Sequence, residues 1–203
     1  MDFSQVLTTT GTMIQETSFA EWMGVSTSIV YLLLATYEKR SCWYFAFTSS
    51  ILYVYLSFAG QLYVDSVLNV FYALMAVYGW FLWNQQKSGT GNEIQQFTLK
   101  WHAQWIAVAL ISGLITGWVL KKYTDQAYPF IDSIAFYLSI LATWMTTKKV
   151  LENWIYFVLI DATMIFIYFN RGYFLTSFLF LAYTLLALRA FFTWRKVYLQ
   201  QQT

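Results

Sequence analysis

Residues 151–169 read LENWIYFVLIDATMIFIYF, an apolar run with one aspartate, Asp161, near its centre. A helix of about 20 mostly apolar residues spans the hydrocarbon core of a bilayer. A carboxylate at the centre of such a helix costs roughly 2.5–3.5 kcal/mol on insertion scales, so its side chain should face the protein interior. The stretch therefore predicts a transmembrane helix whose aspartate belongs to a functional site. A hydrogen bond to a neighbouring helix is the alternative reading of Asp161.

The composition of the whole chain indicates a protein that lies in lipid. Of its 203 residues 59% are hydrophobic, 22% are aromatic and only 11% are charged, whereas soluble domains carry about 25% charged residues. One cysteine and one histidine exclude an internal disulfide and a Cys-rich or His-rich metal site. The net charge of +2 is too small to suggest a nucleic-acid partner. Residues 1–18 lack a basic segment, so the first membrane helix is expected to act as the insertion signal.

Seven runs in the chain are long and apolar enough to span a membrane, which predicts an all-α integral membrane protein. Most of the connections between them are only a few residues long. The predicted helices are Phe19 to Tyr37, Ser41 to Phe58, Val64 to Trp83, Trp101 to Leu120, Tyr128 to Thr147, Leu151 to Phe169 and Tyr173 to Trp194.

The loops predict an orientation in the membrane. The stretch Asn84 to Lys100 is rich in Gln, Gly and Ser and is expected to be a flexible linker. Most basic residues fall on one side of the membrane, in Glu38 to Arg40, in this linker, at Lys148 and Lys149, and after Trp194. Because basic loops stay in the cytoplasm, we expect the N-terminus outside and the C-terminus inside.

An internal repeat organises the predicted helices. A shift of 111 residues places the first three helices on the last three without a gap, with Trp43 on Trp154, Tyr72 on Tyr183 and Trp83 on Trp194. Chance matching between apolar segments is the alternative. The offset spans four helices, an even number, so the two triplets would run parallel. Parallel repeats are typical of transporters that bind substrate near the membrane midplane.

The repeat predicts a three-plus-one-plus-three arrangement. Its expected parts are residues 1–83 (a tail and the first triplet), residues 84–127 (the linker and a linking helix) and residues 128–203 (the second triplet and a tail).

One face of the third predicted helix carries polar and small residues at helical spacing: Asp65, Asn69, Tyr72, Ala76 and Gly79. The small Ala76 and Gly79 are expected to let another helix approach closely. Tyr72 lies near the midplane, and its repeat partner Tyr183 occupies the same depth. The two tyrosines are therefore expected to flank one central cavity, with simple cross-helix packing as the alternative.

Other residues near this depth give weaker signals. Ser28, Ser50 and Ser139 lie close to the midplane, but a serine in a membrane helix often bonds its own backbone. Trp43 is expected to be an interface anchor. Asn153 and Trp154 are candidates for the site, because Trp154 lies two turns before Asp161 on nearly the same face. One carboxylate surrounded by aromatic rings suits a flat organic cation.

These residues resemble the Pnu vitamin transporters over most of the chain, from about Trp22 to Lys196. The motifs that carry the resemblance are Gln61-Leu-Tyr63, Leu68-Asn69-Val70, Tyr78-Gly79-Trp80 with Trp83, Lys149-Val-Leu-Glu152-Asn153-Trp154, Tyr168, Gly172-Tyr173 and Trp194-Arg195-Lys196. The resemblance implies parallel three-helix repeats, similar to the sugar-carrying SWEETs. It also implies facilitated diffusion, with uptake driven by phosphorylation of the vitamin inside the cell.

The sixth predicted helix departs from one branch of that family. Members that carry nicotinamide riboside tend to have a Trp-x-x-x-Asn pattern, where this chain has Phe157 and Asp161. An aspartate at this position is more like the thiamine-carrying branch of the family. Thiamine is therefore favoured over nicotinamide riboside as the substrate, and riboflavin is left open. Asp161 is expected to hold the ring system of the vitamin, and the surrounding candidates are Asn69, Tyr72, Trp154, Asn153, Tyr183, Ser50 and Phe157.

Two other classes of protein stay open. A seven-helix receptor for a small ligand fits the topology, although a retinal protein would need a buried lysine that the seventh predicted helix lacks. An enzyme is not expected, because His102 has no evident acidic or nucleophilic partner at helical spacing and is read as an interfacial residue. The expected partners are a vitamin substrate and the lipid bilayer of a bacterial inner membrane. We expect no cofactor, and a homo-oligomer is left open.

Overall fold

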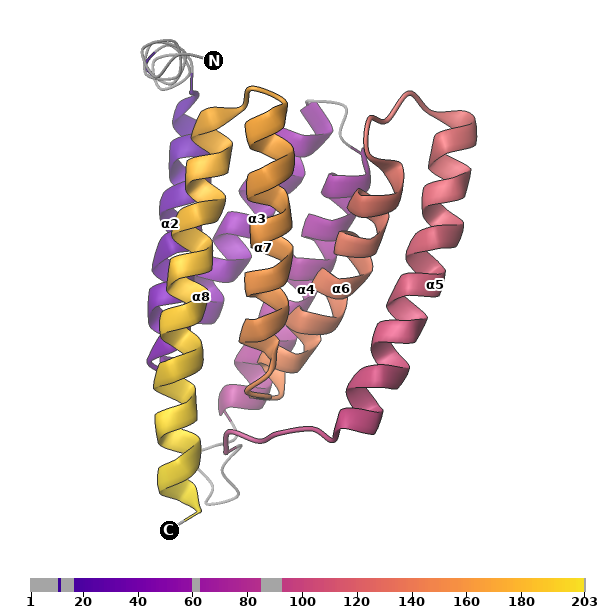
Figure 1. Ribbon diagram of the computed structural model, residues 1–203. Coiled ribbons are helices and arrows are strands. Elements are labelled where there is room, and N and C mark those ends of the chain that lie inside the picture. Colours follow the sequence, from indigo (N-terminus) through magenta and orange to yellow (C-terminus); the bar gives the residue numbers. More distant parts are fainter. Residues whose placement is uncertain (1–10, 12–16, 60–62, 85–92, 203) are drawn as a thin grey trace.

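The computed structural model describes residue 11 and residues 17–59, 63–84 and 93–202, and seven helices in this part of the chain are long and apolar enough to cross a membrane. Successive helices run in opposite directions, and the first helix begins at the end of the bundle opposite to the one where the last helix ends (Figure 1). The helices are α2 (Phe19–Thr36), α3 (Cys42–Ala59), α4 (Tyr63–Asn84), α5 (Leu99–Tyr123), α6 (Pro129–Thr147), α7 (Asn153–Asn170) and α8 (Phe174–Gln201).

These bounds confirm the seven predicted spans and extend two of them. Ser18 and Glu21 cap the start of α2 reciprocally, and Pro129 begins α6 as the sequence predicts. The last helix continues past Trp194 to Gln201, and α5 runs on to Tyr123. The predicted ends marked where the apolar runs stop, but a helix needs no apolar surface once it leaves the membrane.

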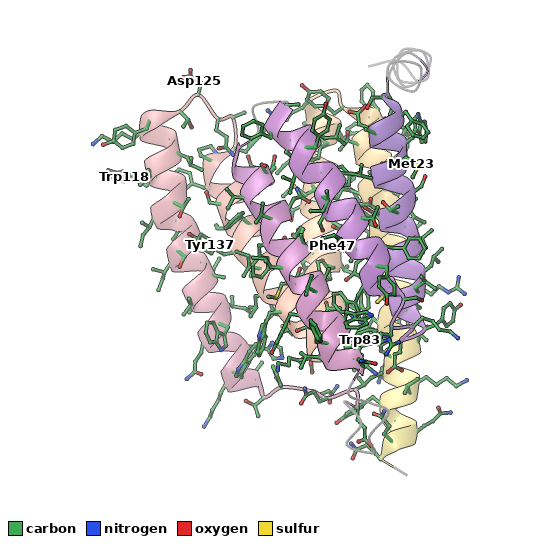
Figure 2. All side chains as sticks on the ribbon, turned by 180° about the vertical axis from the view of Figure 1, so that it is seen from behind. Met23, Phe47, Trp83, Trp118, Asp125 and Tyr137 are labelled. Atoms are coloured by element: carbon green, nitrogen blue, oxygen red, sulfur yellow. The ribbon has the colours of Figure 1, made fainter. Side chains whose placement is uncertain are left out.

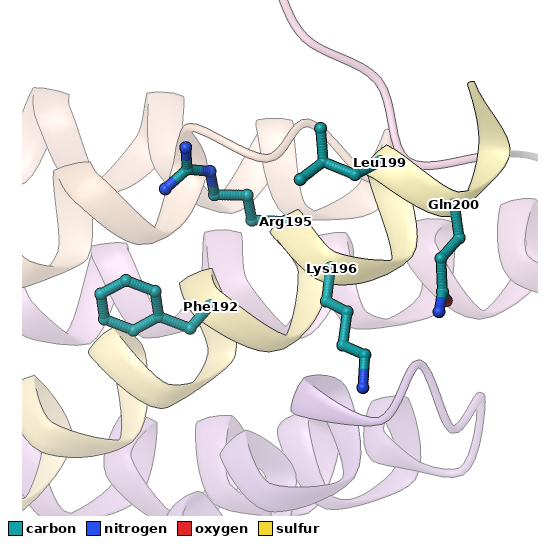
Figure 3. A pocket seen from close by; sticks show the side chains of 5 residues that line it. All are labelled: Phe192, Arg195, Lys196, Leu199 and Gln200. Atoms are coloured by element: carbon teal, nitrogen blue, oxygen red, sulfur yellow. The ribbon is translucent and has the colours of Figure 1, made fainter. Parts of the chain in front are cut away.

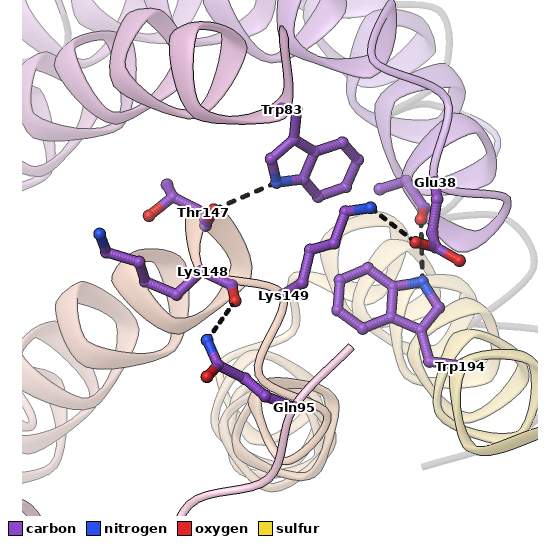
Figure 4. A network of polar contacts seen from close by, with 8 residues as sticks. Glu38, Trp83, Gln95, Thr147, Lys148, Lys149 and Trp194 are labelled. Atoms are coloured by element: carbon purple, nitrogen blue, oxygen red, sulfur yellow. Dashed lines mark hydrogen bonds and ion pairs between the residues drawn. The ribbon is translucent and has the colours of Figure 1, made fainter. Parts of the chain in front are cut away.

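The prediction of a flexible linker is wrong for residues 93–98. Ile94 is only 3% exposed and joins the main core cluster. The backbone of Gln95 bonds to the turn between α6 and α7, with its N–H 3.0 Å from the Lys149 carbonyl and its carbonyl 2.9 Å from the Leu151 nitrogen. The Gln95 side chain donates to the carbonyl of Lys148 at 2.8 Å (Figure 4). This half of the predicted linker is therefore docked, while residues 85–92 lie outside the described part.

Six helices form a closed ring. Their packing order is α2 on α3, α3 on α4, α4 on α6, α6 on α7, α7 on α8, and α8 back on α2. The remaining helix, α5, packs on α6 and stands at the edge of the bundle (Figure 1). Large apolar side chains such as Trp118 and Met23 point outward (Figure 2). An apolar outer surface is what a lipid environment requires.

Small residues fasten α5 to α6. Ala109, Gly113 and Gly117 recur every four residues and are buried. A Cβ atom on Gly113 would lie 2.8 Å from the Cα of Ile134, and one on Gly117 would lie 2.7 Å from the Cα of Phe130. The two backbones are thus in direct contact, as in other small-xxx-small helix pairs.

Gly113→Val is expected to loosen α5 without unfolding the ring, because α5 lies outside the ring and, apart from the contacts of His102 with the start of α7, packs on α6 among the described helices. The clash is with backbone and should cost about 1–3 kcal/mol, as overpacking does. Amide hydrogen exchange should rise along α5 and stay unchanged in α2, α3 and α8. Leu114→Val, at a neighbouring position that is 52% exposed, is the matched control and should leave exchange unaltered. Faster exchange throughout the bundle would contradict this prediction.

Positions matched by the 111-residue shift make matched contacts within each triplet. The Ser66 hydroxyl donates to the Val54 carbonyl at 3.2 Å, and the matched Ser177 donates to Ile165 at 3.1 Å. Each bond joins the third helix of a triplet to its second helix.

Four tryptophans cluster at the end of the bundle where α4 ends, which we call the tryptophan end. Trp43 meets Trp83 edge-on at 5.2 Å between ring centroids, and the matched Trp154 meets Trp194 at the same distance. Trp43 is 2% exposed, so the expectation that it anchors the membrane interface is wrong. It sits against Gly79, whose missing side chain makes room for its indole, as expected for that glycine.

Candidate functional site

Asp161 lies in the middle of α7 and is 8% exposed. The ion pairs formed by the described residues are Glu38–Lys149 and His102–Glu152, and neither involves Asp161. Asp161 acts electrostatically on Tyr72 of α4 and on Tyr183 of α8, so both tyrosines lie near it. The structure thus brings the carboxylate and both predicted tyrosines to the centre of the helix ring and provides no cation there among the described residues.

The two tyrosines reach across the ring in a matched way. Tyr72 interacts with the Ser139 hydroxyl of α6. Its repeat partner Tyr183 interacts with Ser28 of α2, which is the repeat partner of Ser139. Each interaction joins the third helix of one triplet to the first helix of the other. These two tyrosine–serine interactions therefore follow the internal repeat, whereas Asp161 has no matching acid.

The asymmetry is clear at the position matched to Asp161, which is Ser50 of α3. Ser50 is buried and donates to the Ala46 carbonyl of its own helix at 2.8 Å. The carboxylate of Asp161 therefore has a neutral hydroxyl, that of Ser50, at its matched position.

Sequence reasoning missed several residues of this centre. Tyr53 of α3 interacts with both Tyr183 and Ser28. The Ser28 hydroxyl also lies 2.5 Å from that of Ser49, and Thr143 of α6 interacts with Tyr72. A lone hydroxyl in a membrane helix carries little information, because its own backbone is the usual partner. The mid-helix depth of Tyr53 was the one available signal.

Two predicted site residues lie toward the tryptophan end instead of beside Asp161. Asn153 is fully buried; its amide donates to the Val150 carbonyl at 2.6 Å, and it accepts from the Thr146 hydroxyl at 3.1 Å. Trp154 is also fully buried, within the tryptophan cluster. Their visible contacts hold the turn between α6 and α7, and a role in binding stays a prediction.

The other two predicted residues have local contacts. Asn69 donates to the Asp65 carbonyl of its own helix at 2.8 Å. Phe157 is partly buried with its ring centroid 6.2 Å from that of Trp154, so it lies between the tryptophan cluster and Asp161 along α7.

Acidic groups gather at the end of the bundle opposite the tryptophans. Asp65 of α4 and Asp132 of α6 act on each other electrostatically, and both act on Tyr168. Gln126 donates to the Asp132 carboxylate at 2.7 Å. Asp65 and Asp161 both act electrostatically on Tyr72. Arg171 also acts on Tyr168, so this end holds a basic group beside the two carboxylates.

His102 is not the interfacial residue that the sequence suggested. It is 9% exposed, and its Nδ1 lies 2.8 Å from the Tyr156 hydroxyl. Its Nε2 lies 3.9 Å from the Glu152 carboxylate. Both partners belong to the start of α7, so His102 ties α5 to the helix that carries Asp161. The partners come from a distant part of the sequence, which is why helical spacing within α5 did not find them.

A surface hollow of about 450 Å³ lies on the last turns of α8 (Figure 3). Its lining belongs to that single helix and includes two basic residues: Phe192, Arg195, Lys196, Leu199 and Gln200. It holds no carboxylate and lies beyond the tryptophan end, so we do not regard it as the site for a cation.

The fold and its centre define a polytopic membrane protein with one buried acidic site inside a ring of helices. The chain belongs to the nicotinamide mononucleotide transporter family, whose sequence model matches residues 18–196. This match confirms the resemblance to the Pnu transporters.

The chain is also similar to named transporters. The chain is 28% identical to the nicotinamide riboside transporter PnuC of Escherichia coli, over 87% of this chain and 85% of the relative. It is 23% identical to the riboflavin/roseoflavin transporter RibM of Streptomyces davaonensis, over 89% of this chain and 86% of that relative. A crystal structure of the vitamin B3 transporter PnuC matches the fold with a TM-score of 0.74 and 18% identity, over 96% of this chain and 88% of that one.

Proposed function

We propose that this protein carries a flat, positively charged vitamin across the membrane and binds it at Asp161. The observation that carries this proposal is a buried carboxylate without a cationic partner among the described residues, at the centre of a transporter-family fold. A charge in such a place is costly unless something pairs with it. A cationic ligand would supply the missing charge.

The surroundings of Asp161 support a cationic ring system. Tyr72 and Tyr183 both lie within electrostatic reach of the carboxylate, and the face of an aromatic ring attracts a cation. Asp65 and Asp132 at the opposite end would raise the local concentration of cations before they reach the centre.

Two vitamins fit this chemistry. Nicotinamide riboside is a pyridinium cation, and the name of the E. coli relative favours it. Thiamine is also a flat cation, and it is favoured by Phe157 and Asp161, which stand where nicotinamide riboside members tend to have Trp-x-x-x-Asn. The relatives named above give thiamine no support. Riboflavin, named for the S. davaonensis relative, is uncharged and makes the least use of Asp161.

Transport would follow from movement of two parallel triplets, α2–α4 and α6–α8, about the central site, with α5 linking them. The matched contacts within the triplets and the crossed contacts between them support this arrangement. The basic loops would face the cytoplasm. The centre offers no chain of paired ionisable groups among the described residues, which favours facilitated diffusion, with phosphorylation of the vitamin inside the cell to retain it.

Uptake into lipid vesicles that contain the purified protein tests the proposal. Labelled nicotinamide riboside, thiamine and riboflavin should be compared, with empty vesicles as the control. We expect one of the two cations to equilibrate across the membrane without an ion gradient. Accumulation above equilibrium that needs a gradient would contradict facilitated diffusion. Tight binding without uptake would favour a receptor.

A further inference from the structure

Two oppositely charged residues face each other at the tryptophan end (Figure 4). The Glu38 carboxylate lies 2.7 Å from the Lys149 ammonium, and the lysine side chain is only 3% exposed. The residues are 111 positions apart, so they occupy matched positions of the internal repeat. Both have positive φ angles, 52° and 54°, at the turns that follow α2 and α6. Such backbone is uncommon outside glycine and is kept where the surroundings hold it in place.

Two crossed hydrogen bonds flank the ion pair. The indole N–H of Trp83 in α4 donates to the Thr147 carbonyl at the end of α6, at 3.1 Å. The indole N–H of Trp194 in α8 donates to the Ala35 carbonyl near the end of α2, also at 3.1 Å. The Lys149 ammonium lies 5.0 Å from the centre of the Trp83 ring. Every one of these contacts joins the α2–α4 triplet to the α6–α8 triplet.

The opposite end has the reverse electrostatics. There α4 and α6 present Asp65 and Asp132 to each other, and neither carboxylate has a basic partner within ion-pair distance among the described residues. The tryptophan end thus has an ion pair between the triplets, whereas at the other end Asp65 and Asp132 repel each other and Arg171 lies near enough to act on Tyr168. The two ends of the ring are therefore held unequally.

We propose that Glu38, Lys149, Trp83 and Trp194 form a latch that closes the tryptophan end of the transport path and must break when the path opens to that side. This inference rests on the proposed transport function. In the closed state the ion pair and the two indole bonds hold the triplets together. When the path opens to this side, water reaches the charges of Glu38 and Lys149, and the residues buried behind the latch become exposed.

The chain carries its own reporter of this opening. Cys42 is its single cysteine, is fully buried, and belongs to the same core cluster as Trp83 and Trp194. The Lys149 ammonium is near enough to act on it electrostatically. A water-soluble maleimide can reach this thiol only when the tryptophan end opens.

The test is the rate of maleimide labelling of Cys42 in the purified full-length protein, where both ends are accessible to the reagent. Glu38→Gln and Lys149→Gln should each label about tenfold faster than the unaltered protein, the change expected for the loss of one ion pair from an open–closed equilibrium. The double variant Glu38→Lys with Lys149→Glu restores opposite charges at matched positions and should return the rate to that of the unaltered protein. Lys148→Gln is the matched control, because this neighbouring lysine forms no ion pair among the described residues and should leave the rate unchanged.

Labelling of the single variants at the unaltered rate would overturn the latch. So would fast labelling that the charge exchange does not reverse, since that indicates general loosening. If the single variants do not fold, the exchanged pair decides the question: a folded protein with a protected cysteine supports the latch, and an unprotected cysteine refutes it. The assay needs no substrate, so failure to transport any vitamin would refute the proposed function and leave the labelling result standing.

Discussion

Asp161→Asn should bind and carry a cationic vitamin at least about a hundredfold less well, a change of about 2.7 kcal/mol. Two opposite charges 4 Å apart attract by about 4 kcal/mol at the effective dielectric constant of a protein, and the cost of removing both from water offsets part of that gain. Asparagine keeps the size and removes the charge. Titration calorimetry with nicotinamide riboside and thiamine would measure the loss.

The thermal stability of Asp161→Asn should not fall along with its affinity for the vitamin. Asp161 has no ion-pair partner among the described residues, so its neutralisation should leave the thermal midpoint unchanged or raise it. Asp132→Asn, at the other end of the path, is the matched control and should change affinity only several-fold and mainly at low salt. Undiminished cation binding by Asp161→Asn would remove the basis of the proposed site. A fall in both affinity and thermal midpoint would indicate a structural role for Asp161.

Gly79→Val should destabilise the protein by about 3 kcal/mol, at the upper end of the usual cost of overpacking. A Cβ atom at this position would lie 2.4 Å from the Trp43 indole. That indole cannot move aside, because the rings of Tyr31 and Trp83 pack against it. Their ring centroids lie 6.0 and 5.2 Å from that of Trp43. The thermal midpoint in detergent, measured by loss of the monodisperse species, would report the change.

A compensating substitution makes the cause specific. Gly79→Ala alone should lower the midpoint, and combining it with Trp43→Phe should recover part of the loss, because the smaller ring leaves room for a methyl group. Val77→Leu, at a position of the same helix that is 45% exposed, should have no effect. Equal midpoints for Gly79→Val and the unaltered protein would show that Trp43 has another place to go.

The sequence predicted the helices and their depth because lipid imposes a strict pattern. A span must be apolar over a fixed length, and a carboxylate within it stands out, so Asp161 was found from the chain alone. The internal repeat added Tyr72 and Tyr183, which the structure brings to Asp161. Their part in binding remains a prediction.

What the sequence missed depends on contacts between distant segments. A tryptophan or histidine at a helix end has the same local pattern whether it faces lipid headgroups or a neighbouring helix. Trp43 is buried because Gly79 of α4 receives it, and His102 because Tyr156 and Glu152 come to it from α7. Similarly, Ile94 lies in a stretch whose composition is typical of a polar linker. It is buried because the neighbouring Gln95 bonds to the turn between α6 and α7.

The matched positions also bear on how one chain with two similar halves differs from a pair of identical chains. Two copies of one triplet, related by a twofold axis, would set like charges against each other where Glu38 now meets Lys149. They would also place two carboxylates at the centre, where this chain has Asp161 and the neutral Ser50. In one polypeptide the two halves can differ in sequence, so that the singly charged cargo proposed above would meet a single counter-charge.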